Sequence, residues 1–174
     1  RQCTRSDYDG SSVSASDLAV LERAAAIPGV RLILLTAPAE IAPVLELMLA
    51  GNAAQVGDAA FREELVAWLR FSTESAVDTR DGLYAACSGN PVLPNWLGKL
   101  MFGQFFTETA ENDKLARQVG SSSGLAILVS EQDDPPHWVA AGRSYQRFAL
   151  QATALGLKHA FVNQAVEVPA TRAA

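Results

Sequence analysis

The sequence predicts an α+β domain in which long helices pack around a small buried β-sheet. Two short apolar runs, 30–35 and 125–129, have the composition of strands that are covered on both faces. A long apolar helix is expected to begin at Pro135 and to end before Gly156. Apolar residues recur along it at steps of three and four and its flanks are small, so we expect it to be buried on most sides, in a domain centre or an interface.

The first two helices are predicted from capping residues and apolar faces. Ser14 is a good N-cap with Asp17 three residues later, and this helix should end at Pro28-Gly29. After the first strand, a second helix is expected over 39–50. Pro43 fits that helix only if it lies in the first turn, where its missing N–H costs nothing.

The middle of the chain is predicted to hold two apolar helices separated by a long loop. Asp58 caps the first of these helices, which runs to Arg70. Periodicity is absent from 72–95, and a loop of that length is typically a lid, a binding loop or an arm on a partner. The apolar helix predicted at 96–106 is expected to cover a pocket or pack on another chain. We therefore treat 72–106 as a candidate lid or interface arm.

The last predicted elements are a short helix over 112–119 and a buried strand over 157–162. Residues 120–124 (GSSSG) match the G-x-S-x-G pattern of hydrolase nucleophiles. That pattern needs a strand before the serine and a helix after it, whereas the predicted order here is helix and then strand. The segment is therefore interpreted as a flexible connection.

A polar cluster precedes the long helix, but it is better explained by capping than by metal binding. It comprises Glu131, Asp133, Asp134 and His137. Asp134 fits the N-cap, and acidic residues at a helix N-terminus favour the helix dipole. With His159 as the only other histidine, no metal site is predicted. His159 itself is interpreted as a strand-end residue with a satisfied ring.

Other conspicuous side chains have both a structural and a functional interpretation. Arg143 and Arg147 lie four apart on the long helix, where they either pair with acids or contact a phosphate or carboxylate at a chain–chain boundary. The three tryptophans are interpreted as core or interface anchors rather than as stacking platforms for a ligand. They are Trp68, Trp96 and Trp138.

Composition narrows the class of protein. The 174 residues correspond to a single domain, with 49% hydrophobic and 19% charged residues. A net charge of -5 without any basic run argues against nucleic acid and anionic membranes as partners, and no apolar run is long enough to span a bilayer. Cys3 and Cys87 are interpreted as reduced thiols, which predicts a cytoplasmic protein.

The first five residues form a short basic motif, RQCTR. Arg1 and Arg5 lie four apart among small polar residues, about ten residues before the first capped helix. The motif is either a solvated terminus or a cradle for a phosphate, which guanidinium groups bind through paired hydrogen bonds.

The order of these segments resembles that of the FMN-dependent nitroreductase family. RQCTRSDYDGSSVSASDLAVLERAA is similar to the arginine- and serine-rich opening of that family, and HWVAAGRSYQRFALQATALGLKHAFVNQ to its central dimer helix and flavin-proximal strand. The segments EELVAWLRFS, DGLYAACSGNP, LPNWLG and SEQDDPPHW resemble more narrowly the Acg-type FMN-binding oxidoreductases. That branch joins two nitroreductase-like halves in one chain, and this sequence resembles the second half.

The resemblance implies a nitroreductase-like fold over 1–174 and a bound FMN. Arg1 and Arg5 match arginines of the family, and Arg1 is expected at the FMN phosphate. Gln2 and Cys3 fall where the family has an arginine or histidine and a serine near the phosphate and ribityl chain. Asn163 and Gln164 belong to the turn whose backbone amide faces N5 of the flavin, where the family usually has glycine at the position of Gln164. These six residues are the predicted cofactor-binding residues, and no catalytic side chain is predicted, because the flavin carries the redox chemistry.

By resemblance, the expected function is NAD(P)H-dependent reduction of nitroaromatic, quinone or similar acceptors. Two alternatives stay open: a non-catalytic protein that sequesters FMN in an occluded site, and a structural half-domain built for dimerisation. The expected partners are a nicotinamide cofactor, a small acceptor, and either a second copy or a missing N-terminal half. Since the sequence opens on Arg1 without an initiator methionine, we expect it to be a fragment of a longer two-half chain.

Overall fold

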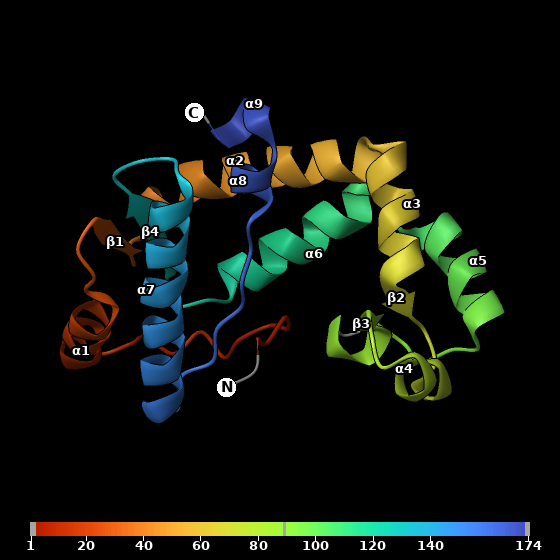
Figure 1. Ribbon diagram of the computed structural model, residues 1–174, viewed down its shortest axis with the longest axis horizontal. Coiled ribbons are helices and arrows are strands. Elements are labelled where there is room, and N and C mark those ends of the chain that lie inside the picture. The colour runs from red at the N-terminus through yellow and green to blue at the C-terminus, as the bar shows by residue number, and fades with distance from the viewer. Residues whose placement is uncertain (1–2, 89, 173–174) are drawn as a thin grey trace. The chain divides into compact units, whose positions relative to one another are not determined.

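The computed structural model, which describes residues 3–88 and 90–172, is an α+β structure dominated by helices (Figure 1). Its internal contacts divide the chain into two compact units. Among the described residues, unit 1 comprises Cys3, Tyr8–Ala42 and Ser121–Phe161, and unit 2 comprises Thr4–Asp7, 43–120 without 89, and 162–172. Across these described residues, no helix combines the length and apolar character needed to cross a bilayer.

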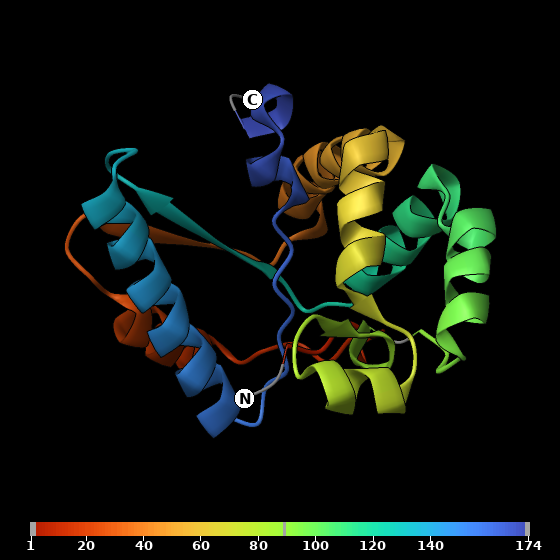
Figure 2. The ribbon, with the colours of Figure 1, turned by 45° about the vertical axis from the view of Figure 1, so that its right-hand side comes forward.

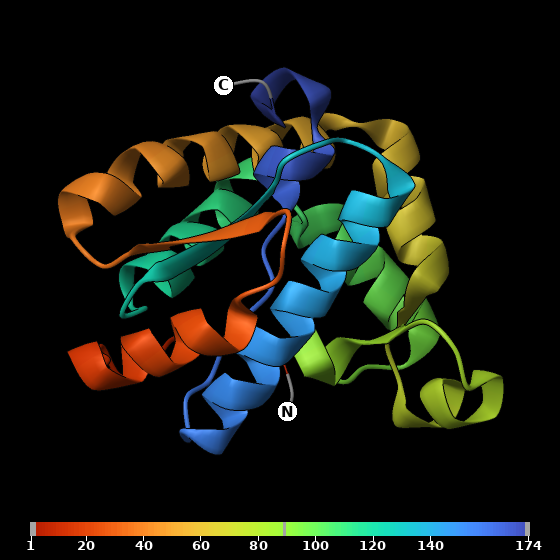
Figure 3. The same cartoon turned by 60° about the vertical axis from the view of Figure 1, so that its left-hand side comes forward.

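Unit 1 is built on an antiparallel pair of strands. Strand β1 (Val30–Leu35) pairs with β4 (Leu125–Ser130), from Val30 opposite Ser130 to Leu35 opposite Leu125. Helices α1 (Ala15–Ala25) and α7 (Pro135–Ala154) pack against each other and against the strands (Figures 2 and 3). All four elements were predicted from the sequence within a few residues.

Two predicted helix caps in unit 1 are confirmed. The side chain of Ser14 accepts a hydrogen bond from the backbone N–H of Asp17 at 3.1 Å, and that of Asp134 accepts one from His137 at 3.0 Å. Pro135 occupies the first turn of α7, where a missing N–H leaves no bond unmade. Each cap satisfies donors that a helix N-terminus otherwise leaves without a partner.

A buried serine contributes to the contact between α1 and α7. Ser144 is buried in α7, and its hydroxyl donates a hydrogen bond to the carbonyl of Ala25 at 2.6 Å. Ala149 and Ala152 are buried on the same helix, while Leu21 is buried on α1. The Ser144 hydroxyl therefore satisfies one of the carbonyls that the last turn of α1 leaves open.

Burial in unit 1 is lower than the sequence predicts. In α7 only Ser144, Ala149 and Ala152 are buried, whereas Trp138 is 58% exposed, so α7 does not lie in the centre of the domain, and its burial in an interface stays a prediction. The residues of β1 and β4 are partly or fully exposed rather than buried. Both strands are edges of a two-stranded sheet, so neither has neighbours on both sides.

The strand predicted at 157–162 is also wrong. Gly156 ends α7 in the left-handed region with φ 75°, as expected of a C-terminal glycine. The segment that follows is extended coil, and among the described residues its strand contact is a single parallel bridge between His159 and Cys3. A bridge of one residue pair does not make a ladder, although the apolar composition resembles that of a strand.

Unit 2 consists of helices around one short parallel strand pair, β2 (Leu69–Arg70) with β3 (Leu83–Tyr84). Its helices are most of α2 (Pro38–Gly57), α3 (Ala59–Trp68), α4 (Thr73–Thr79), a 3₁₀ turn η1 (Ala85–Ser88), α5 (Asn95–Phe105), α6 (Glu108–Gly120), α8 (Gln164–Glu167) and α9 (Pro169–Arg172). The N-cap predicted at Asp58 is confirmed by its hydrogen bond from Ala60 N–H at 2.9 Å.

Two helices are longer than predicted. Helix α2 extends past residue 50 to Gly57, and α6 begins at Glu108 rather than at 112. Pro43 lies inside α2, beyond the first turn to which the sequence analysis confined it. The proline removes one backbone bond from the helix, and the remaining bonds on either side continue the ladder.

The segment 72–95 is not the structureless loop that its lack of periodicity predicts. It contains α4, β3 and η1, and Ser72 caps α4 by accepting a hydrogen bond from Ser75 N–H at 3.1 Å. Arg70 fixes the end of α4 through Asp81 at 2.7 Å and Thr79 at 3.0 Å. Elements this short cannot display a periodic pattern, so periodicity does not reveal them.

The core of unit 2 lies where β2 and β3 meet α3 and α5. Leu69, Phe71 and Ala85 are buried together, with Leu65 and Phe102 packed against them. A Cβ built on Gly98 of α5 would lie 2.3 Å from Cγ of Phe71, so only glycine allows α5 to approach this closely.

Candidate functional site

A pocket of about 370 Å³ in unit 2, here named the α5–α6 pocket, is the best candidate site. Its volume lies at the lower end of the range of roughly 300–1,000 Å³ that small-molecule sites occupy. The α5 side contributes residues at helical spacing, Gly98, Met101, Phe102 and Phe105. The α6 side does the same with Glu111, Lys114, Leu115 and Gln118. One face of each helix therefore borders the pocket.

One wall of the pocket is aromatic. The rings of Phe102 and Phe106 stack with centroids 4.3 Å apart and an interplanar angle of 17°. Phe71 lies beside them in the core of unit 2, which holds the wall in place. A wall of this kind suits a flat, apolar ring system.

The polar side of the pocket carries more positive than negative charge. Arg5 and Lys114 line it together with one carboxylate, that of Glu111. Two cations against one anion favour a ligand that carries negative charge. Asn52 adds a neutral amide and is itself held by a hydrogen bond from its Nδ2 to Asn112 Oδ1 at 2.8 Å.

Gln164 brings an unusual acceptor to the pocket. Its Oε1 atom is buried and has no hydrogen-bond partner among the described residues. The backbone of Gln164 lies against α2, where a Cβ on Gly51 would be 2.7 Å from its carbonyl oxygen. A buried acceptor without a partner costs about 1–3 kcal/mol.

The structure brings two of the six predicted cofactor residues to this pocket, Arg5 and Gln164. Asn163 is next to Gln164 but does not line the pocket, and its Nδ2 donates a hydrogen bond to Glu167 Oε1 at 3.3 Å. Cys3 belongs to unit 1, where its Sγ accepts a hydrogen bond from Phe161 N–H at 3.2 Å. Arg1 and Gln2 lie outside the described residues.

Most of the lining was missed by sequence reasoning. The faces of α5 and α6 can be recognised as helical stripes, but a stripe does not reveal whether it borders a core or a pocket. The loop residues Asn90, Pro91 and Leu93 gave only a turn signal. Lys114 was the available clue, since it is a basic residue three positions after Glu111 and next to the buried Leu115.

The polar cluster before α7 behaves as the capping interpretation predicts. Asp134 bonds both the backbone and the ring of His137, and these hydrogen bonds hold the pKa of its carboxyl below the ordinary value. Asp133 accepts a hydrogen bond from Trp138 Nε1 at 2.7 Å. Within 3–88 and 90–172, no group of three or more His, Cys, Asp or Glu side chains is placed to hold a metal.

The other candidates from the sequence also acquire definite surroundings. The connection interpretation of the GSSSG segment agrees with its position between α6 and β4, where Ser121 Oγ accepts a hydrogen bond from Tyr8 N–H at 2.9 Å. Arg147 donates to the carbonyl of Ala26 at 3.5 Å, just past the end of α1. The three tryptophans are exposed, so none is a core residue of this chain, and their role as interface anchors stays a prediction; they are Trp68, Trp96 and Trp138.

His159 differs from its predicted role. Both of its ring nitrogens are buried, and neither has a hydrogen-bond partner among the described residues, so the expectation of a satisfied ring is wrong. The ring meets Tyr145 edge-on at 6.1 Å between centroids. Burial lowers the pKa of His159, because an imidazolium without a partner is disfavoured away from water.

Comparison with known proteins gives no further assignment. No protein-family model matches the sequence, and no curated protein and no solved structure is significantly similar to it.

Proposed function

We propose that this chain binds FMN in the α5–α6 pocket and takes part in the NAD(P)H-dependent reduction of nitroaromatic, quinone or similar acceptors. One observation carries the proposal. Arg5 and Gln164, which the family resemblance assigned to the flavin from opposite ends of the sequence, line the same pocket. Residue types alone gave no reason for these two side chains to share a cavity.

The chemistry of the lining fits the parts of FMN. Arg5 and Lys114 supply cations for a phosphate, and charge-assisted hydrogen bonds of this kind are about twice as strong as neutral ones. The stacked rings of Phe102 and Phe106 supply a flat apolar wall for the ring system. The unpartnered Oε1 of Gln164 can accept a hydrogen bond from a ring N–H or a ribityl hydroxyl.

When bound, the flavin supplies the hydride chemistry, so the protein needs no nucleophile or general base. The role of this chain is to hold the cofactor and to shape its surroundings. The cationic side of the pocket neutralises the phosphate, and the aromatic wall excludes water from one face of the ring. The acceptor at Gln164 fixes the orientation of the group that donates to it.

The predicted homodimer or pseudo-dimer is part of this proposal. Trp96 is 70% exposed and Leu100 is 57% exposed, and both belong to α5, the helix that lines the pocket. Large apolar side chains at that exposure are suited to contact with a second chain. Sedimentation velocity on the wild type and on Trp96→Ser with Leu100→Ser tests this part separately from FMN binding.

The first experiment is the visible absorption spectrum of the purified chain after incubation with FMN and desalting. A retained flavin band supports the proposal, and NADH or NADPH oxidation with a panel of acceptors then separates an enzyme from a protein that only sequesters the cofactor. A folded chain that retains no flavin, and shows no saturable quenching of FMN fluorescence, contradicts binding by this chain.

A further inference from the structure

A second pocket in unit 2 has a volume of about 480 Å³, and the charged side chain in its lining is a carboxylate, that of Glu64. We name it the α3 pocket. It is lined by Phe61, Glu64, Leu65, Trp68, Gly82 and Leu83. Four of these residues belong to α3 at steps of three, one and three, so one face of this helix provides most of the lining.

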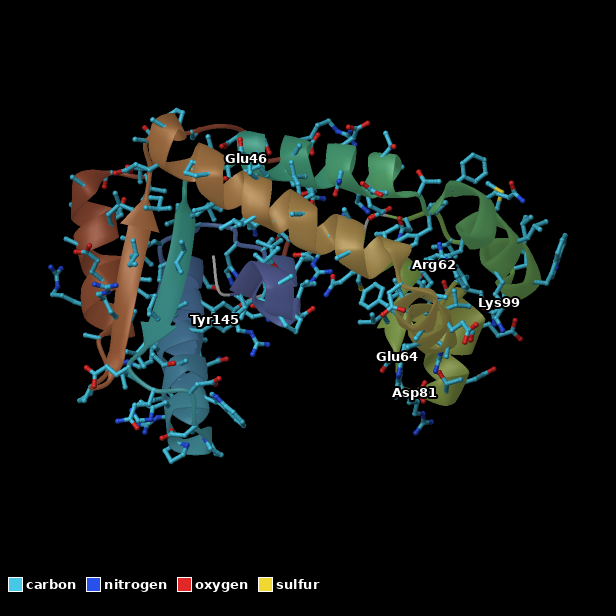
Figure 4. The ribbon with its side chains drawn as sticks, turned by 90° about the horizontal axis from the view of Figure 1, so that it is seen from above. Glu46, Arg62, Glu64, Asp81, Lys99 and Tyr145 are labelled. Atoms are coloured by element: carbon cyan, nitrogen blue, oxygen red, sulfur yellow. The ribbon has the colours of Figure 1, made fainter. Side chains whose placement is uncertain are left out.

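The carboxylate of Glu64 has no partner of opposite charge in the part of the chain that the structure describes. Arg62 is two residues away on α3, which turns it to the other side of the helix, as the labelled side chains show (Figure 4). The guanidinium of Arg70 lies close to Gly82, which lines the pocket. It is already used, because its Nη2 donates to Asp81 at 2.7 Å and its Nη1 to Ala67 O at 2.8 Å.

Two aromatic side chains accompany this carboxylate. Phe61 precedes Glu64 by three residues and Trp68 follows it by four, so both rings share the face of α3 that carries the charge. Trp68 is 48% exposed, which leaves much of its surface open to a ligand. The faces of aromatic rings attract cations, most strongly in tryptophan, and aromatic rings with a carboxylate together favour an organic cation over a neutral molecule.

We infer that the α3 pocket binds a small quaternary ammonium ligand. A metal ion does not fit, since Mg²⁺ and Ca²⁺ require several oxygen ligands and the lining offers one carboxylate. A primary ammonium is strongly hydrated and needs several acceptors to replace its water. A quaternary ammonium donates no hydrogen bonds, and its methyl groups match the apolar remainder of the lining, which includes Leu65 and Leu83.

The position of Gly82 preserves the shape of this pocket. It adopts φ 74°, and a Cβ at this position would lie 2.3 Å from the carbonyl oxygen of Trp68. Any larger residue must therefore move the backbone that ends α3, and with it the ring of Trp68. Gly82 thus helps to fix the position of Trp68, while Leu65 and Leu83 also line the α5–α6 pocket.

The test compares choline with 3,3-dimethylbutan-1-ol, its neutral analogue of the same shape. Binding is followed by Trp68 fluorescence in the Trp96→Phe, Trp138→Phe background, whose two substitutions lie outside the pocket. Choline is expected to bind saturably and at least fivefold more tightly than the neutral alcohol. Equal affinity for the two, or no saturable response to choline, overturns the proposal.

Two variants locate the charge. Glu64→Gln should weaken choline binding by roughly three- to fivefold, as expected for one partly exposed ion pair, and leave the neutral alcohol unaffected. Glu63→Gln is the matched control, because it removes the same charge from the neighbouring exposed position outside the pocket. Equal effects of the two substitutions overturn the assignment of Glu64. Self-association that buries Trp68 and abolishes its response to choline assigns the pocket to a second copy instead.

Discussion

Replacing Gly98 with alanine tests the packing on which the α5–α6 pocket depends. The new Cβ would lie 2.3 Å from Cγ and 2.5 Å from Cβ of Phe71. These are the atoms nearest the backbone of Phe71, which is itself only 7% exposed, so they cannot swing away. Overpacking of a core site costs about 1–3 kcal/mol. Alanine recovers about 1 kcal/mol through its higher helix propensity, which leaves a net loss of up to about 2 kcal/mol.

Gly103 provides a matched control in the same helix. It is exposed, and a Cβ built there meets no atom within 4 Å. Gly103→Ala should therefore gain the full helix propensity and stabilise the protein by about 1 kcal/mol. The two alanine variants are expected to differ by about 1–3 kcal/mol in the free energy of unfolding, since only the overpacking term separates them.

The assay is urea unfolding followed by far-ultraviolet circular dichroism, with both variants and the wild type at the same pH and concentration. Adding Phe71→Leu to Gly98→Ala should recover part of the loss, which a double-mutant cycle measures as a coupling energy. If both glycine variants are stabilised by the same amount, α5 does not pack on Phe71 as described and the reasoning fails.

The remaining predictions concern the pocket and the acid sensitivity of unit 2. Arg5→Ala should weaken FMN binding, measured by fluorescence titration, by about 1.5–3 kcal/mol. Arg117 is an exposed arginine of α6 outside the pocket, so Arg117→Ala should leave the affinity unchanged. Equal losses of affinity in the two variants would contradict a specific contact of Arg5 with FMN. Gln164→Met removes a buried acceptor that has no partner in the ligand-free protein, so it should stabilise that protein by about 1–3 kcal/mol in urea unfolding. The same substitution should weaken FMN binding, because FMN would lose the acceptor. A loss of stability in the ligand-free protein would contradict this account. Hydrogen bonds from Arg70 lower the pKa of Asp81 from 3.8, so the carboxylate stabilises the fold above that value, and this contribution is lost as the pH falls through the lower folded pKa. Between about pH 5 and pH 2, the free energy of unfolding should therefore depend less on pH in Asp81→Asn than in the wild type. An unchanged pH profile would contradict this linkage.

Local signals in the sequence were sufficient for the main helices. Ser14, Asp58 and Asp134 were identified as N-caps, and each side chain accepts the expected backbone hydrogen bond. A cap depends on residues within three or four positions, so one sequence contains all the information that it needs. The strands β1 and β4 were found for a similar reason, since a short apolar run between turn residues is a local feature.

Burial could not be predicted in the same way. The apolar run 157–162 was taken for a strand, but a strand requires a partner of matching length, and Cys3 offers His159 a single bridge. Trp138 lies on an apolar stripe, yet α7 buries only Ser144, Ala149 and Ala152. Both errors arise because the hydrophobicity of a segment shows which residues can be buried, but does not show whether another element packs against them.

The candidate site shows the same division. Arg5 and Gln164 were reached only through the resemblance to a family, and the pocket that they line is formed by tertiary packing of α5 and α6. The helix-then-strand order predicted around the GSSSG motif is confirmed, because the order of neighbouring elements is a local property. The unpartnered Oε1 of Gln164 has no sequence signal at all, since it depends on which donors fail to reach it.

Unit 2 is assembled from three separate stretches of the chain, of which 4–7 comes first and the segment from Val162 onward comes last. During synthesis, α5 and α6 leave the ribosome well before Gln164 does. The lining of the pocket is therefore complete only after Val162 and Gln164 have been synthesised. Division of the chain between residues 120 and 121 therefore gives two fragments, neither of which contains a whole unit. These two fragments would have to reassociate to form the pocket.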